Sequence, residues 1–137
     1  MKRIIFILFL TLHLGYILAN PIDKETAKKV AVNFMNSKVA SSMIVKNVIT
    51  EDLNGQISFY VVNFQTGGWV MVSADNSAVP VLGYNLFGEY KIEDEKPEAF
   101  IELTTSYKEQ ITISKNLKSS NLEIISKWEK LLSENKL

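Results

Sequence analysis

The stretch "FQTGGWVMVSADNSAVPVLGYN", residues 64–85, indicates more than any other how this chain folds. It contains two short apolar runs, residues 69–73 and residues 79–84, with a polar turn at residues 75–77 between them. Short apolar runs bounded by turn-forming residues are typical of β-strands. Because Pro80 has no amide hydrogen, the second of these strands is expected at the edge of a sheet.

Several side chains in this stretch have a simple structural interpretation. Gly67 and Gly68 predict a tight turn with positive φ. A phosphate-binding loop is disfavoured there, because no Lys-Ser or Lys-Thr pair follows the glycines. For Ser73 and Asp75, hydrogen bonding within the turn is favoured over a catalytic role. The aromatic residues that follow strand spacing are expected in the core, and they are Phe59, Tyr60, Trp69 and Tyr84.

Two further strands are expected before this stretch, at residues 44–49 and 57–64. Asn54 and Gly55 lie between them and form the strongest short signal for a β-hairpin. The strand at residues 57–64 has apolar side chains on both alternations, which predicts that both of its faces are covered. The four strands together predict an antiparallel meander.

Helices are expected before and after these strands. Asp23 is a suitable N-cap for a first helix that ends near Lys38. Its apolar residues recur at helical spacing, and they are Ala27, Val30, Ala31, Phe34 and Met35. Pro97 suits the first position of a second helix, for which the expected apolar stripe is Phe100, Leu103, Tyr107 and Ile111. With a last helix at about residues 122–132, the fold class is α+β: an N-terminal helix packed on a four-stranded antiparallel meander, followed by two C-terminal helices.

The first 19 residues have the layout of a secretory signal peptide. A basic start at Lys2 and Arg3 precedes an apolar stretch, and the small residue Ala19 follows it. The stretch is short for a membrane span, which needs about 20 apolar residues. We therefore expect cleavage after Ala19, export to the periplasm or the medium, and no stable membrane association afterwards. Residues 20–137 are expected to form a single domain that is monomeric when unbound.

The composition of the remaining chain excludes several classes of function. Without Lys2 and Arg3, 13 basic residues remain, all lysines, against 15 acidic ones, a formal charge of −2. This balance argues against nucleic-acid binding, which needs clustered basic residues. The only histidine, His13, lies in the signal segment, and the chain has no cysteine. A nucleophile with its imidazole base and a zinc site are therefore excluded, and no enzyme activity, catalytic residue, metal or cofactor is expected.

Two parts of the chain carry a resemblance to a known family. The motif "GGWVMVSAD" at residues 67–75, followed by "VPVLGY" at residues 79–84 with its Gly83-Tyr84 pair, resembles the hallmark of streptopain-type cysteine protease prodomains. The segments "PEAF" at residues 97–100 and "YKEQI" at residues 107–111 are similar to the helix that follows in those prodomains. The resemblance covers nearly all of residues 22–115, and the first helix also falls where theirs does.

This resemblance implies a protease inhibitor rather than a protease. In the zymogens a prodomain of this size precedes the catalytic domain, whereas this sequence ends at Leu137. We therefore expect a relative of the free-standing streptopain inhibitors, the Spi family, which bind a streptopain-like cysteine protease and occlude its active site as detached propeptides. Such inhibition needs shape and hydrogen bonds, and no reactive group.

The resemblance also implies which residues contact the protease. The segment from Glu93 to Phe100 matches the part of the prodomain that approaches the active site, and its candidate contacts are Pro97, Glu98, Ala99 and Phe100. Trp128 in the last helix is a further candidate, with a role in the core as an equal alternative. Ala99 departs from the family pattern, which has an asparagine at this position. The contact then either moves to a neighbour such as Glu98 or is dispensable, and a non-inhibitory relative stays open as an alternative.

Three other functions remain open from the sequence. The chain could act in trans as a folding chaperone for a separately encoded protease. It could be a surface adhesion or assembly module that exposes the strand near Pro80 for pairing with another chain. An enzyme based on carboxylates is the last alternative, and the sequence offers no constellation of residues for it.

Overall fold

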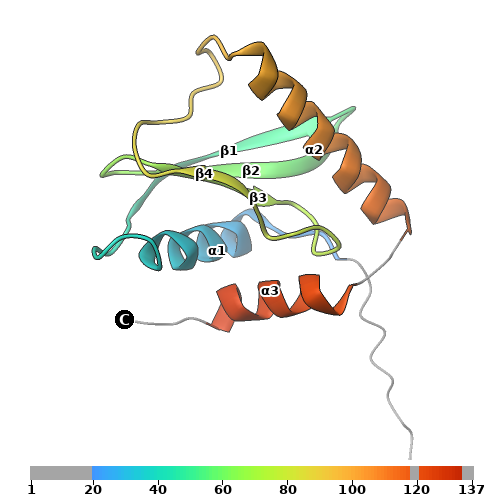
Figure 1. Cartoon of the computed structure of the whole chain (residues 1–137), viewed down its shortest axis with the longest axis horizontal. Coiled ribbons are helices and arrows are strands. Elements are labelled where there is room, and N and C mark those ends of the chain that lie inside the picture. The colour runs from blue at the N-terminus through green and yellow to red at the C-terminus, as the bar shows by residue number, and fades with distance from the viewer. Residues whose placement is uncertain (1–19, 118–120, 134–137) are drawn as a thin grey trace, which may run out of the picture.

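The computed structural model describes residues 20–117 and 121–133; the expected signal peptide, residues 1–19, lies outside them. A four-stranded antiparallel sheet has the order β1-β2-β3-β4, so it is the expected meander. Helices α1 and α3 lie on one face of this sheet and α2 lies on the other (Figure 1). The elements are α1 (Lys24–Asn36), β1 (Val45–Leu53), β2 (Gln56–Phe64), β3 (Trp69–Ser73), β4 (Val81–Asn85), α2 (Glu98–Leu117) and α3 (Leu122–Ser133). The α+β fold class is confirmed.

The first hairpin forms where the sequence predicts it. Asn54 and Gly55 have φ values of 54° and 78°, and Leu53 pairs with Gln56 across them. Two consecutive residues with positive φ give the turn a twist that matches the flanking strands. Strand β1 is longer than expected and continues through Glu51 and Asp52, because the hairpin brings these residues into register with β2.

Strand β2 is buried on both faces, as its sequence predicts. Its side chains alternate between two apolar clusters, because successive residues of a strand point to opposite faces. The cluster under α1 and α3 includes Tyr60, Val62 and Phe64 from this strand. The cluster under α2 includes Phe59 and Val61 from it. Each face of the sheet therefore has its own core.

Helix α1 begins as expected and covers one face of the sheet. The Asp23 side chain accepts a hydrogen bond from the Thr26 amide at 2.7 Å, as an N-cap does. The helix ends at Asn36, two residues earlier than expected. Four of the five residues of its expected stripe are fully buried, and they are Ala27, Val30, Ala31 and Met35. Phe34 is half-buried and packs edge-on against the Tyr84 ring, with the ring centroids 4.9 Å apart. The expectation that Tyr84 lies in the core is wrong: its side chain is 45% exposed, because β4 is the edge strand of the sheet.

Helix α3 packs beside α1 under the same face of the sheet. Asn33 of α1 donates from its side chain to the Leu131 carbonyl of α3 at 2.6 Å. Trp128 is only 4% exposed, and its indole nitrogen donates to the Ala78 carbonyl at 2.8 Å. This burial with a satisfied donor favours the core role of Trp128 over the alternative of a partner contact.

The second helix differs from its expected pattern in one residue. Leu103 is 47% exposed, whereas Ile111 is buried and Phe100 and Thr104 are half-buried. With 3.6 residues per turn, the buried side of α2 is centred between the Phe100 and Thr104 positions, and Leu103 falls beyond its edge. Within residues 20–117 and 121–133, no helix has both the length and the apolar composition needed to cross a membrane.

Candidate partner-binding surface

We call residues 93–100, which lead into helix α2, the docking segment. It consists of the last part of the connection from β4 to α2 and the first turn of α2. The connection rises from the sheet at one end of the molecule (Figure 1). The side chains of Pro97, Glu98 and Ala99 are exposed, and that of Phe100 is half-buried. The Pro97 carbonyl accepts hydrogen bonds from the amides of Phe100 (2.9 Å) and Ile101 (3.1 Å). Helix α2 therefore begins at Glu98, and Pro97 precedes its first residue, whereas the sequence predicts Pro97 as that residue. Four of the five expected contact residues thus lie together at the first turn of a helix, whereas Trp128 lies in α3 on the opposite face of the sheet.

An aromatic cluster supports the docking segment from below. The Phe100 ring lies 6.4 Å from the Trp69 ring and 6.3 Å from the Tyr90 ring, centroid to centroid, and Trp69 and Tyr90 are 5.8 Å apart. These distances are typical of packed aromatic pairs. The tryptophan of the "GGW" motif is therefore half-buried in the support of the docking segment rather than in the sheet core alone.

Asn63 fixes the backbone where the connection passes over the sheet. Its side chain is fully buried, accepts from the Tyr90 amide and donates to the Tyr90 carbonyl, both at 2.8 Å. The same amide nitrogen also donates to Asn47 at 2.8 Å. An amide side chain that pairs with both backbone groups of one residue holds that residue as a strand neighbour does. The sequence analysis missed this role, although a lone asparagine in an otherwise apolar strand was a signal for it.

A second set of polar contacts joins the connection to β1 and α2. The Tyr90 hydroxyl donates to Glu51 at 3.0 Å, and Lys108 of α2 lies 2.8 Å from the other oxygen of the same carboxylate. Both charged side chains are about one-fifth exposed. Because Glu51 is shared between two donors, it ties Tyr90 and α2 to the same strand. Sequence periodicity could not predict these contacts, since the partners are 39 and 57 residues apart.

Lys96 joins the loop of the docking segment to the Tyr90 ring and to backbone carbonyls of the same loop. Its amine lies 4.8 Å from the centre of the Tyr90 ring, within the range of a cation–π contact. The amine also donates to the backbone carbonyls of Lys91 and Asp94. The acidic residues on this loop, Glu93, Asp94 and Glu95, remain exposed. These contacts of Lys96 therefore hold the loop of the docking segment in place, and its acidic side chains face solvent.

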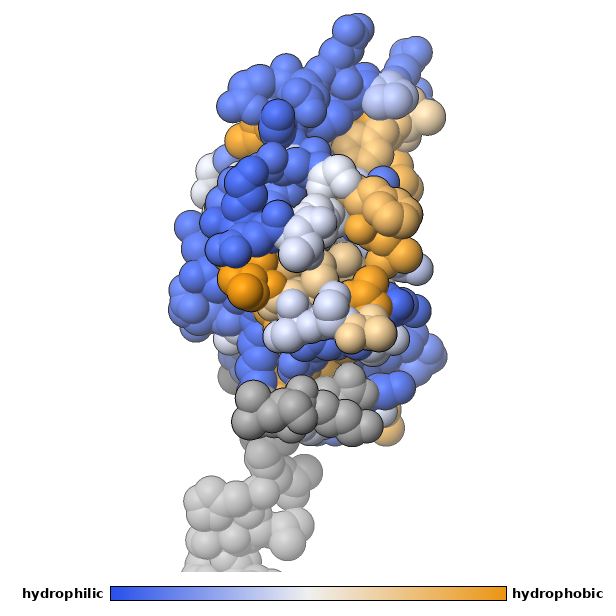
Figure 2. Space-filling view, turned by 90° about the vertical axis from the view of Figure 1, so that its left-hand side faces the viewer, coloured by the Kyte–Doolittle hydropathy of each residue, from blue (hydrophilic) through white to orange (hydrophobic). Residues whose placement is uncertain are grey.

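Two exposed apolar side chains lie in the connection just before the docking segment. Phe87 is 78% exposed and Ile92 is 63% exposed. Figure 2, which faces this end of the molecule, shows apolar surface gathered beside a hydrophilic region. Contiguous apolar surface rimmed by polar residues is typical of protein-binding sites. The sequence analysis did not select these two residues, because single apolar residues in loops carry no periodic signal.

The glycine pair positions this connection relative to the sheet. Gly67 and Gly68 both have a φ of 89°, as the sequence predicts. The Gly68 amide donates to the Gly88 carbonyl at 2.7 Å. The turn between β2 and β3 therefore holds the start of the connection that carries the docking segment.

The remaining motif residues have structural positions. Ser73 and Asp75 are buried and hydrogen-bonded within their turn, where Asp75 also accepts from the Ser77 amide at 2.9 Å. The Pro80 carbonyl accepts from the Ser73 amide at 3.0 Å, and β4 begins one residue later, at the edge of the sheet. Gly83 lies beside Met71, where an added Cβ would be 3.8 Å from the sulfur atom. None of these residues is arranged for chemistry.

The buried phenol of Tyr90 leads to a testable pH dependence. Burial, and then the negative charge of Glu51, raise the pKa of the Tyr90 hydroxyl to about 12. An unfolded tyrosine has a pKa of about 10, so the folded state favours the neutral phenol. This contribution to stability is complete below a pH of about 10 and is lost as the pH rises through about 12.

We therefore expect the wild-type protein to lose stability between these pH values more steeply than Tyr90→Phe does. The measurement is the urea midpoint of both proteins across this range. Parallel slopes would show that the Tyr90 hydroxyl does not have the raised pKa.

Comparison with known proteins places this fold in a family. The family model described as "Spi protease inhibitor" matches residues 19–111. The chain belongs to the Spi protease inhibitor family. The match includes α1, all four strands, the docking segment and α2 as far as Ile111. Helix α3 lies beyond the matched residues.

Curated relatives of this Spi-family chain are streptopains. Those of Streptococcus pyogenes, including its serotypes M1 and M28, are each 31% identical to it over 120 residues. The match covers 75% of this chain and 29% of each streptopain, so the chain corresponds to less than one-third of the relatives' length. No solved structure matches the chain at a significant level.

Proposed function

We propose that this chain is an exported inhibitor of a streptopain-type cysteine protease, and that it acts as a detached propeptide that occludes the active site. The observation that supports this most is the family match, because it extends through the docking segment and into α2. In the docking segment, Glu98 and Ala99 are exposed, while Lys96 contacts the Tyr90 ring and Phe100 packs against Trp69. The protease class follows from the similarity to streptopains.

The way the docking segment is held supports occlusion by a preformed surface. Asn63 fixes the backbone of Tyr90, and the rings of Trp69 and Phe100 pack under the first turn of α2. Pro97 further restricts the backbone at the start of the helix. A segment that is ordered before binding loses less conformational entropy on docking. The exposed side chains at its tip, Glu98 and Ala99, would then enter the cleft of the protease.

The proposed inhibition is non-covalent. The sequence contains no cysteine, and its one histidine lies in the expected signal peptide. The acidic residues of the described ranges do not gather into a cluster that could hold a metal ion. Contacts with the protease would therefore consist of apolar packing by residues such as Phe87 and hydrogen bonds from the docking segment. No cofactor or nucleic acid takes part in this proposal.

Export is part of the same proposal. The sequence of residues 1–19 supports delivery to the periplasm or the medium, where the inhibitor would be a monomer without membrane attachment until it meets its protease.

The test is selective inhibition by purified residues 20–137. We expect the protein to slow substrate cleavage by a streptopain-type protease and to leave papain largely unaffected, because the surface derives from a streptopain-like prodomain. Equal inhibition of both enzymes would contradict the proposal and indicate a generic wedge. If the native protease is unaffected but its refolding from denaturant is accelerated, the chaperone alternative holds instead.

A further inference from the structure

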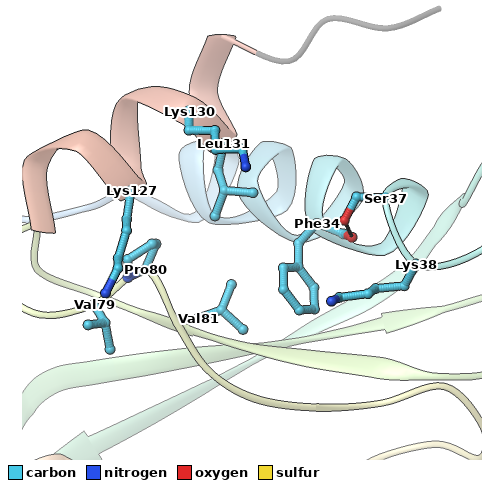
Figure 3. Close-up of a pocket in the computed structure, with 9 residues that line it drawn as sticks. All are labelled: Phe34, Ser37, Lys38, Val79, Pro80, Val81, Lys127, Lys130 and Leu131. Atoms are coloured by element: carbon cyan, nitrogen blue, oxygen red, sulfur yellow. Dashed lines mark hydrogen bonds between the residues drawn. The ribbon is translucent and has the colours of Figure 1, made fainter. Parts of the chain in front are cut away.

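A second surface lies on the opposite side of the sheet from α2. It is a groove of about 440 Å³ between the end of α1, helix α3 and the chain that enters β4. Its apolar lining comes from all three elements: Phe34 from α1, Leu131 from α3, and residues 79–81 from the turn into β4. Figure 3 shows these side chains converging on the groove. None of the residues that the structure describes lines both this groove and the cavity beneath the docking segment.

Among the residues that the structure describes, the charged ones that line the groove are all lysines. They are Lys38, Lys127 and Lys130, and no acidic residue of the described ranges lines it. Lys38 lies 5.2 Å from the Phe34 ring centre, and Lys127 reaches down toward Val79 (Figure 3). The Lys127 amine also forms an ion pair with Glu123 at 2.7 Å, a contact of small energetic value between side chains that are both largely exposed. In a protein whose exported part is acidic overall, this groove is therefore a local positive site.

Beside the groove lies an edge of the sheet, where backbone N–H and C=O groups of β4 can pair with another chain. Strand β4 pairs with β3 alone among the described strands, so its other side is an edge. The groove begins at residues 79–81, where the chain enters this strand. Extended segments of other proteins bind to such edges by main-chain hydrogen bonds, and pockets beside the edge accept alternate side chains. The edge thus favours a peptide over a lipid or another small amphiphile.

We propose that this groove binds an extended acidic segment of a partner protein, with a bulky apolar side chain over Phe34 and Leu131 and carboxylates near the three lysine amines. This goes beyond the proposed inhibition, because the groove lies on the face of α1 and α3 and the docking segment on the face of α2. The chain would bind this second protein segment, from its protease or from another protein, while the docking segment stays bound to the protease.

The probe for this site is a short fluorescein-labelled peptide in which Asp and Val alternate around a central Phe. We expect saturable binding by fluorescence anisotropy that weakens as salt is added. The same peptide with Lys in place of every Asp should not bind. Because no protease is present in this assay, its outcome is independent of the proposed inhibition.

Charge reversal identifies the groove as the binding site. Lys127→Glu with Lys130→Glu is expected to weaken peptide binding at least tenfold, with little change in melting temperature because both side chains are exposed. The matched control, Lys24→Glu with Lys29→Glu, makes the same charge change on exposed positions of α1 outside the groove and should bind nearly as the parent does.

Three results would overturn this assignment. The first is equal affinity for the acidic and the lysine peptide. The second is unchanged binding by the Lys127→Glu, Lys130→Glu variant. The third is binding of oleate or of vesicles containing anionic lipid, with no binding of the peptide, which would make the groove an amphiphile site.

Discussion

Gly68→Val is expected to lower the free energy of unfolding by about 3–5 kcal/mol, because it adds steric overlap to backbone strain. Gly68 has a φ of 89°, where side chains are disfavoured. A Cβ at this position would lie 2.9 Å from the Met35 methyl carbon and 3.0 Å from the carbonyl oxygens of Asn85 and Leu86. The methyl group could move, but the two carbonyls belong to the backbone beside β3. We expect the melting temperature to fall by roughly 10–20 °C.

Gly88→Val is the matched control for this substitution. Gly88 also has positive φ, at 72°, but a Cβ there would meet no atom within 4 Å. We therefore expect it to cost only the backbone strain, about 1–3 kcal/mol. Equal destabilisation by the two variants would mean that the close approach of Gly68 to the connection after β4 does not contribute to stability.

The largest effect on inhibition is expected from charge reversal at the tip of the docking segment. Glu98→Lys with Ala99→Arg should weaken inhibition of a streptopain-type protease at least tenfold, or about 1.4 kcal/mol. Both side chains are exposed at the start of α2, so they would meet the protease directly. The loss of an acidic residue from the first turn of α2 lowers the free energy of unfolding by about 0.3–1 kcal/mol. The melting temperature should therefore shift by only a few degrees. Inhibition constants and melting curves of the same preparations provide the measurement.

Glu109→Lys with Gln110→Arg makes the same change in charge farther along the exposed side of α2. It should leave inhibition within about twofold of the parent, because 11 residues of helix span about 16 Å. Ala99→Asn, which restores the residue expected at this position in the prodomains, should inhibit equally well or better. If the tip reversal inhibits as well as the parent, the protease contact lies elsewhere, and the exposed Phe87 becomes the next candidate.

The parts of the fold that local sequence determines could be predicted. Asn54 and Gly55 form the first hairpin because asparagine tolerates positive φ and glycine, which has no side chain, adopts it freely, and Asp23 caps α1 through a neighbouring amide. Strand β3 begins at Trp69 and ends at Ser73, as expected from the turn residues on both sides. These features depend on contacts between residues that are close in the chain.

The parts that depend on distant contacts could not be predicted. Asn63 holds the backbone of Tyr90, 27 residues away, and Glu51 receives Lys108 from a different layer of the fold. Strand and helix periodicities contain no information about such pairs. Leu103 was expected to be buried, but it is exposed because it falls beyond the edge of the side of α2 that packs on the sheet. Consequently, the sequence predicts the position of the docking segment but not what supports it.

The central claim is that this chain blocks a streptopain-type protease at its active site, and an inhibition titration at several substrate concentrations tests it most directly. The concentration of protease active sites is first determined by active-site titration, and the protease is then mixed with increasing amounts of residues 20–137. We predict complete inhibition at an equimolar ratio, an apparent inhibition constant that rises linearly with substrate concentration, and an uncut inhibitor at the end of the assay. Binding that leaves turnover unchanged, or inhibition independent of substrate concentration, would contradict occlusion of the active site.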